Sequence, residues 1–224
     1  MDTIEQTILE LEAVSEIQNL MGSYSFFLDG RKYDDLMGLF SVTQPDVRVE
    51  LGGVYVGLDS IARLYLGKHY DQHAGGHYPG FEGRGIVAKH PQNTPCVVVG
   101  RDGKTAKGTW VSLGFAFFLQ SDRKEQHWGM FRYGADFIFE NGQWRIWHLK
   151  VYDGFMTDGN HSWSDPVPRP MPPSGPGENA GPPPDLFPPD YPPTSGYRYD
   201  IHIPVPYAPE VPEPYSVFDP DKAN

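Results

Sequence analysis

A stripe of apolar residues at steps of three and four runs along the first part of the chain. Its members are Ile4, Ile8, Leu11, Val14, Ile17, Met21, Tyr24 and Leu28. This period places them on one face of an α-helix. Thr3 and Gln6 form a capping-box pattern at its start, and Gly30 is a typical stop. The pattern therefore predicts a long helix that ends near Asp29, followed by a shorter helix over residues 33–40.

Alternation of apolar and polar residues replaces the helical period after the second helix. Residues 47–57 read as two short strands joined by a turn at Gly52-Gly53. A third helix is expected to begin near residue 59. Residues 67–85 are rich in glycine, histidine and tyrosine and show no period, so we expect a loop there.

The remainder of the domain predicts antiparallel hairpins. Strands are expected over residues 96–99, 106–119, 130–140 and 143–153, with a polar break at 121–126 and a tight turn at Asn141-Gly142. Helices that precede a run of hairpins indicate an α+β domain, in which the helices pack on one side of a curved antiparallel sheet. Both faces of the strand at 106–119 are apolar, which either a partner on the outer face or an ordinary two-sided core would explain.

The composition of the chain changes near Ser164, because most of the 23 prolines lie beyond it. We therefore divide the chain into a domain, residues 1–160, and an extended proline-rich tail, residues 161–224. The tail also carries many aromatic and aliphatic residues, and Tyr197 to Val205 alternates like a strand. We expect it to lie as a strap along the surface of its own domain or of a partner subunit. A flexible linker is the alternative.

The charge and the cysteine content narrow the class of protein. The net charge is −11 without a basic face, which argues against nucleic acid or an anionic membrane as a partner. The single cysteine, Cys96, excludes an internal disulfide framework and fits a reducing compartment. The N-terminus is acidic, and no apolar run approaches the roughly 20 residues that span a bilayer. We expect a soluble, cytoplasmic protein.

Asp29 and two histidines are the first candidates for chemistry. Asp29 lies in the last turn of the first helix, next to Phe26 and Phe27. It is either a solvated or capping acid, or a pocket acid with a shifted pKa. His90 precedes a strand and His148 lies within the last strand of the domain. A lone histidine is more often structural, but beside a carboxylate in an apolar cavity it forms an acid–base pair that works near neutral pH.

The sequence offers little support for a metal or a cofactor. His69, His73 and His77 have a spacing that a helix could turn into a metal pair, but Gly75-Gly76 interrupts them and no carboxylate supports them. A lid or surface loop fits this stretch better than a metal site. The chain has no phosphate loop, dinucleotide fingerprint, nucleophile elbow or CxxC motif. Any enzyme here would work without a cofactor.

Several short motifs follow one another in a definite order. They are Tyr24-x4-Asp29, Tyr33-Asp34-Asp35-Leu36, Gly57-Leu58-Asp59-Ser60-Ile61, His90 before Asn93-Thr94-Pro95, Asp102-Gly103-Lys104-Thr105, Gly108-Thr109-Trp110 and Asn141-Gly142-Gln143-Trp144. Over roughly residues 4–155 this order resembles the SnoaL-like branch of the nuclear-transport-factor-2-like superfamily, which includes scytalone dehydratase, bile-acid 7α-dehydratase and ketosteroid isomerase. The resemblance implies a cone, in which a bent sheet wraps the helices around one apolar pocket, and a homodimer or higher homo-oligomer.

The resemblance also implies roles for particular residues. In the dehydratases an aspartate at the end of the first helix and a histidine on the pocket wall exchange protons with the substrate, and Asp29 and His90 match these positions. Tyr24 matches the tyrosine that polarises the substrate, and Tyr55 matches a second tyrosine. Scytalone dehydratase pairs its aspartate with a further histidine on the long strand, where this chain has Trp110.

These matches lead to a specific functional expectation. The catalytic candidates are Asp29, His90 and Tyr24, and the substrate-binding candidates are Tyr55, Trp110, Tyr133, His148 and Phe27. We expect a cofactor-independent lyase that eliminates water or formaldehyde from a hydrophobic aromatic alcohol, such as a lignin-derived diaryl compound. An isomerase or cyclase of polyketide or steroid type and a non-catalytic binding or assembly module are the alternatives.

Overall fold

The computed structural model describes residues 3–72, 87–120, 123–158, 161, 162, 164, 188–194, 202, 204 and 208–215. Within these residues lie the helices α1 (Thr3–Asp29), α2 (Tyr33–Met37) and α3 (Leu58–Gln72) and the strands β1 (Arg48–Glu50), β2 (Val54–Val56), β3 (Val87–Lys89), β4 (Asn93–Val99), β5 (Thr105–Gln120), β6 (Arg123–Glu140) and β7 (Gln143–Asp158). No helix in this part of the chain is long and apolar enough to cross a membrane.

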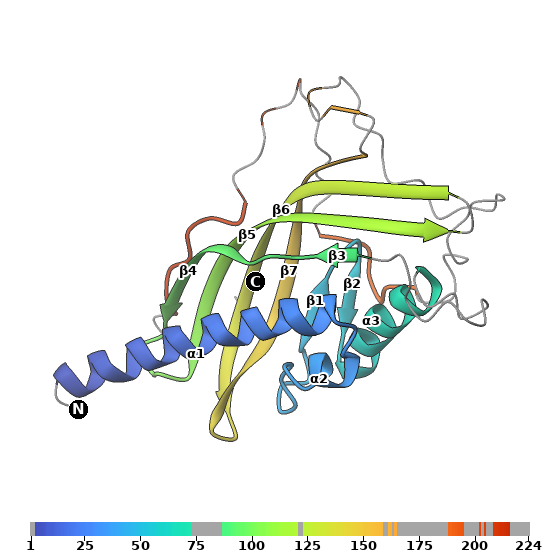
Figure 1. Cartoon of the computed structure of the whole chain (residues 1–224). Helices are drawn as coiled ribbons and strands as arrows, with labels where there is room; N and C mark the ends of the chain where they lie inside the picture. Colours follow the sequence, from blue (N-terminus) through green and yellow to red (C-terminus); the bar gives the residue numbers. More distant parts are fainter. Residues whose placement is uncertain are drawn as a thin grey trace.

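One curved sheet holds all of these strands. Its order is β2-β1-β7-β6-β5-β3, and β4 also pairs with β5. The pairs are antiparallel except for β1 and β7, which run parallel. Figure 1 shows α1 crossing in front of the sheet, with α2 and α3 beside its β1–β2 end. The predicted α+β cone, with N-terminal helices against a strongly bent sheet, is confirmed.

The two faces of the sheet differ in what covers them. Trp110 on β5 pairs with Tyr133 on β6, and the Tyr133 ring contacts Tyr24 of α1. We call the face of the sheet that carries Trp110 and Tyr133 the inner face. Successive side chains of a strand point to opposite faces, so Lys107, which lies three residues before Trp110, belongs to the other face. Lys107 pairs with Asp136, which defines the outer face.

An irregularity in the register bends the long strands (Figure 1). Met130 pairs with Phe155 and Phe131 with Asp153, which leaves Gly154 as an extra residue on β7. A Cβ atom on Gly154 would lie 2.0 Å from the carbonyl oxygen of Met130. Only glycine therefore allows this close approach of β6 and β7, and the bend curls the sheet around the helices.

The end of α1 is formed by a Schellman motif. The amide of Lys32 donates to the carbonyl of Phe27 at 2.9 Å, and the amide of Arg31 donates to that of Leu28 at 3.2 Å. The helix stops next to Gly30, as predicted, but the residue in the left-handed conformation is Arg31, with φ of 57°. Gly30 is required for space instead, because a Cβ there would lie 2.9 Å from the carbonyl oxygen of Phe26.

Several predicted boundaries need correction. Residues 67–72, expected in a loop, belong to α3, whereas His73 and His77 lie outside the described residues. β6 begins at Arg123 rather than 130, and β7 continues to Asp158 rather than 153. The turn at Asn141-Gly142 is confirmed, because both residues have positive φ. The apolar residues at the start of the α1 stripe are exposed, namely Ile4, Ile8 and Leu11.

The described parts of the tail lie on the chain's own domain. Tyr191 forms an antiparallel bridge with Val54 of β2. The carboxylate of Asp190 accepts hydrogen bonds from Ser60 and Arg63 of α3.

Farther along the tail, Arg132 donates to the carbonyl of Ala208 at 3.2 Å, and the ammonium group of Lys107 lies 4.4 Å from the ring centre of Tyr215. This second piece of the tail therefore covers the outer face of the sheet. The strand expected over 197–205 falls almost wholly outside the described residues, and the domain boundary at 160/161 stays a prediction.

Candidate active site

Asp29 and His90 form a close pair at the end of α1. Oδ1 of Asp29 lies 2.8 Å from Nδ1 of His90, and Oδ2 accepts a longer bond of 3.4 Å from the His90 amide. The ammonium group of Lys89 lies 3.6 Å from Oδ2. The Asp29 side chain is 9% exposed and that of His90 30%. An ionised Asp29 selects the tautomer with its proton on Nδ1, which leaves Nε2 to exchange protons with a ligand.

α1 also holds the backbone of the segment that carries His90. Ser25 precedes Asp29 by four residues, so both side chains emerge on the same side of the helix. The Ser25 hydroxyl donates to the carbonyl of His90, and Nε2 of Gln92 reaches the same carbonyl at 3.4 Å. The last two turns of α1 therefore fix both the ring and the main chain of His90.

Three buried tyrosines adjoin this pair. The hydroxyls of Tyr24 and Tyr65 lie 3.0 Å apart, and the rings of Tyr24 and Tyr133 meet edge to face at 6.3 Å. Burial raises the pKa of the Tyr24 phenol well above its usual value, and the charges of Tyr65 and Asp29 raise it further. Burial, Tyr24 and Asp29 do the same to the pKa of Tyr133. Both phenols stay protonated at neutral pH and can donate hydrogen bonds.

The interior beside these groups contains polar atoms without a partner. Ser112 follows Trp110 by two residues on the same strand, so its side chain points to the inner face. Its hydroxyl is fully buried, and neither it nor Oε1 of Gln92 has a hydrogen-bond partner among the described residues. Buried polar atoms are nearly always paired in proteins, which makes these two atoms candidates for contact with a ligand or a water.

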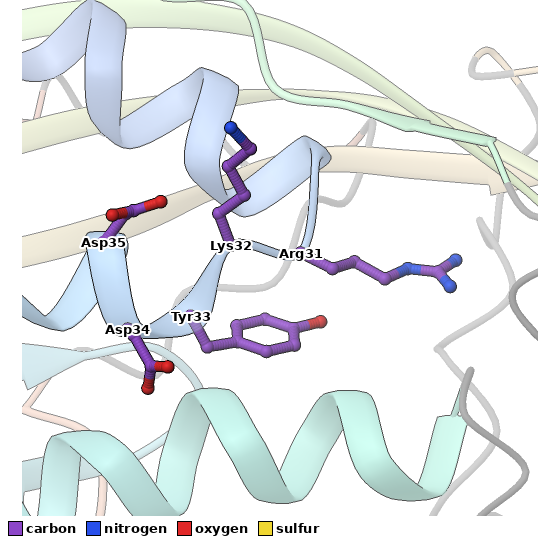
Figure 2. A pocket seen from close by; sticks show the side chains of 5 residues that line it. All are labelled: Arg31, Lys32, Tyr33, Asp34 and Asp35. Carbon is purple, nitrogen blue, oxygen red and sulfur yellow. The ribbon is translucent and has the colours of Figure 1, made fainter.

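A hollow of about 340 Å³ lies where α1 meets α2. Figure 2 shows its lining residues, which are Arg31, Lys32, Tyr33, Asp34 and Asp35. The lining includes neither Asp29 nor His90, although Arg31 follows Asp29 by only two residues. The hollow and the acid–base pair are therefore adjacent features rather than one site.

The sequence of residues 9–150, more than half of the chain, matches the SnoaL-like domain. The chain belongs to the SnoaL-like family. No curated protein sequence matches it.

Several solved structures share the fold. A hexachlorocyclohexane dehydrochlorinase of type 2 is 13% identical, with a TM-score of 0.52 over 70% of this chain and 97% of that one. A candidate scytalone dehydratase from Novosphingobium aromaticivorans is 17% identical, with a TM-score of 0.50 over 75% of this chain and all of the other. A candidate aromatic ring hydroxylase from the same organism is 17% identical, with a TM-score of 0.52 over 66% and 94%. At these identities the likeness establishes the fold alone.

The structure separates the candidate residues of this SnoaL-like domain into two groups. Asp29, His90, Tyr24 and Tyr133 lie together, and Trp110 lies beside Tyr133 on the inner face, with its ring edge to face against Phe137 at 5.9 Å. Phe27, Tyr55 and His148 do not join them. Phe27 precedes Asp29 by two residues, which turns it roughly 200° around the helix, and it packs against the core.

Tyr55 and His148 also lie elsewhere. Tyr55 is buried on β2, where the charges of Arg63 and Asp190 act on its pKa, which burial raises. His148 pairs with Asp136 on the outer face, because the register of β6 and β7 turns it away from Tyr133. The expectation that His148 lines the pocket is therefore wrong.

Four residues of the site are not predicted by the sequence pattern, namely Ser25, Tyr65, Lys89 and Gln92. The position of Ser25 one helical turn before Asp29 was a usable signal. Tyr65 lies in the predicted third helix, and nothing local distinguishes a core tyrosine from one that bonds Tyr24. Among the described residues no group of three or more His, Cys, Asp or Glu side chains is arranged to hold a metal ion.

Proposed function

We propose that this SnoaL-like protein is a cofactor-independent lyase that eliminates water or formaldehyde from a hydrophobic aromatic alcohol. The observation that carries the proposal is the 2.8 Å contact between Asp29 and His90, which leaves Nε2 of a partly exposed imidazole without a described partner. The dehydrochlorinase and the candidate dehydratase that share the fold have names that denote eliminations. Cytoplasmic location and a homo-oligomer accompany the proposal as predictions.

Proton transfer at Nε2 of His90 drives the elimination. In the loss of water, the imidazolium protonates the leaving hydroxyl, the C–O bond breaks, and the imidazole so formed takes the proton of a neighbouring C–H as the double bond forms. In the loss of formaldehyde, the imidazole takes the proton of a primary alcohol. The C–C bond then breaks, its electrons form the new double bond and expel the benzylic hydroxyl, and the imidazolium just formed protonates that hydroxyl so that it leaves as water. Transfer of this kind contributes roughly 10²–10⁴-fold to the rate.

The surrounding groups hold His90 and the substrate. Asp29 orients the imidazole and stabilises its charged form, as a carboxylate bonded to Nδ1 does in other acid–base pairs. Protonated Tyr24 and Tyr133 donate hydrogen bonds to substrate oxygens. Trp110 offers a flat surface for an aromatic ring.

Substitution of the pair tests this function. Asp29→Asn and His90→Gln should each reduce turnover of 1,2-diarylpropane-1,3-diols and simple benzylic alcohols by about 10²–10⁴-fold, with circular dichroism showing a folded protein. Asp59→Asn, at an exposed acid of α3, is the matched control and should keep full activity. If both site variants fold and retain full turnover, the assignment is wrong.

The same pair could serve an isomerase or cyclase with Asp29 or His90 as the base. The molecular mass of the product distinguishes these activities from a lyase. Mass spectrometry of the product separates these activities. A lyase product is lighter than the substrate by water, formaldehyde or both, whereas an isomerase product keeps the mass of its substrate. Turnover with unchanged mass would replace the lyase by an isomerase in the same site.

A further inference from the structure

Residues 90–92 carry the imidazole of the site and lie between two strands of the sheet. β3 ends at Lys89 and β4 begins at Asn93, and both strands pair with β5. The registers of β3 and β4 on β5 agree, so no residue is inserted or skipped between Lys89 and Asn93. Pro91 has no amide hydrogen to donate and favours an extended conformation of the residue before it. Contacts outside the strand ladder therefore set the position of His90.

Helix α1 supplies such contacts from two side chains that lie one turn apart. Asp29 contacts the His90 ring at 2.8 Å and accepts a longer bond of 3.4 Å from the His90 amide. The hydroxyl of the buried Ser25 donates a short bond to the carbonyl of the same residue. Nε2 of Gln92 also reaches this carbonyl, but at 3.4 Å, which is longer than a typical hydrogen bond. Ser25 is therefore the closest described partner of the His90 carbonyl.

Helix stability alone would not favour a serine at position 25, well inside α1. Serine has a lower helix propensity than alanine. Inside a helix its hydroxyl also tends to bond a carbonyl one turn earlier, which bends or weakens the helix. Here the hydroxyl instead bonds a carbonyl 65 positions away in the sequence. A side chain that opposes the local structure and holds a distant backbone group indicates a role in the site.

We propose that Ser25 is a positioning residue, which holds the main chain of His90 so that the imidazole meets Asp29 and presents Nε2 to the substrate. Asp29 alone attaches His90 at two points, the ring and the amide. Two attachments leave a residue free to turn about the line that joins them, and the bond from Ser25 to the carbonyl removes this freedom. The role in turnover rests on the proposed function, whereas the effect of the bond on the imidazole does not.

Kinetics of Ser25→Ala, which removes only the hydroxyl, test the role in turnover. We expect kcat for the diaryl and benzylic alcohols to fall by about tenfold, because a small misplacement of a reacting group slows its reaction. KM should change little, since the hydroxyl is bonded to His90. Ser25→Cys keeps the shape of the side chain with a much weaker donor and should show the same fall. Ser15→Ala, at an exposed serine of the same helix, is the matched control and should keep the wild-type kcat.

Nitrogen-15 NMR of protein labelled at histidine tests the position of the ring without a substrate. The His90 signals are those that are absent from the spectrum of His90→Gln. At a pH at which the imidazole is neutral, the bond to an ionised Asp29 should keep the proton of wild-type His90 on Nδ1. In Ser25→Ala the ring is held less firmly against Asp29, so part of the population should move its proton to Nε2. Ser15→Ala should give the wild-type spectrum.

The two measurements separate this proposal from the proposed function. A shift toward the second tautomer in Ser25→Ala and Ser25→Cys supports the positioning role even if no alcohol is turned over. A wild type that turns over the alcohols, with Ser25 variants that keep both its kcat and its tautomer, would overturn the role of Ser25 and leave the lyase intact. An equal loss of kcat in Ser15→Ala would also overturn it, because the effect would then belong to the helix as a whole.

Discussion

The protein has two aspartate–histidine pairs, one at the end of α1 and one on the outer face of the sheet, and the two pairs look alike in isolation. Nδ1 of His90 lies 2.8 Å from Asp29 on the inner side, and Nδ1 of His148 lies 3.1 Å from Asp136 on the outer face. Their exposure differs. The side chains of the inner pair are 9% and 30% exposed, whereas those of Asp136 and His148 are 0% and 2% exposed.

The second imidazole nitrogen explains why the two pairs have different roles. Nε2 of His148 lies 3.4 Å from Asp46, and its ring stacks on Trp147. Lys107 lies 3.8 Å from Asp136 and is covered in turn by Tyr215 of the tail. Every side of His148 thus meets the protein, while Nε2 of His90 can meet a ligand. Access to the second nitrogen, rather than the acid–imidazole distance, separates a candidate catalytic pair from a structural one.

The largest effect is expected from His148→Gln. Loss of the imidazole removes the closest described partner of the fully buried Asp136, which lies 3.1 Å from it, and breaking a buried pair costs about 3 kcal/mol. Urea denaturation should show this loss, while turnover per folded molecule should not change. His90→Gln should lower turnover per folded molecule and leave the stability in urea unchanged. If His148→Gln were as stable as wild type but inactive, the active site would lie on the outer face.

Tyr24→Phe should have an intermediate effect, on activity rather than folding. The change removes one hydroxyl donor beside Asp29 and keeps the ring contact with Tyr133. A neutral hydrogen bond of this kind contributes about tenfold to kcat/KM. Because the pKa of Tyr24 is raised well above its usual 10.0, the activity of wild type should not fall near pH 10 through this residue.

Tyr191→Phe, at an exposed tail tyrosine, is the matched control for the loss of a hydroxyl. An unchanged kcat/KM in Tyr24→Phe would restrict Tyr24 to packing.

The smallest effect is expected at the contact between Asp190 of the tail and α3. Hydrogen bonds from Ser60, the Val56 amide and Arg63 lower the pKa of Asp190 below its usual 3.8. A carboxyl group whose pKa is lower in the folded state than in the unfolded state stabilises the fold at pH values above its unfolded-state pKa. This stability is lost as the pH falls through the folded-state pKa. The free energy of unfolding of wild type should exceed that of Asp190→Asn by about 0.5 kcal/mol at neutral pH. This difference should vanish at acidic pH below 3.8. A difference that persists unchanged in acid would contradict this anchor.

Local patterns predicted the parts of the site that lie close together in sequence. The helical stripe and its stop placed Asp29 at the end of α1, and the motif order singled out His90. The stripe did not reveal that Ile4, Ile8 and Leu11 are exposed, because periodicity identifies a face of a helix but not what covers it. The sheet covers only the later turns of α1.

Long-range geometry accounts for what the sequence could not show. His148 was placed in the pocket because a shift of one residue in strand register moves a side chain to the other face, and the register of β7 depends on irregularities opposite β6. The bond between Tyr24 and Tyr65 joins residues 41 positions apart. No local signal predicts such a contact between two helices.

The bridge between Val54 and Tyr191 has a consequence for how the protein avoids self-association. β2 is an edge strand, and a free edge offers backbone groups to which another chain can add. The tail satisfies this edge through bonds between Val54 and residues 190 and 191, and prolines stand on both sides at 188–189 and 192–193. Proline has no amide hydrogen, so the added segment cannot serve as the next template. The tail therefore ends the sheet, and its removal should expose an edge prone to aggregation.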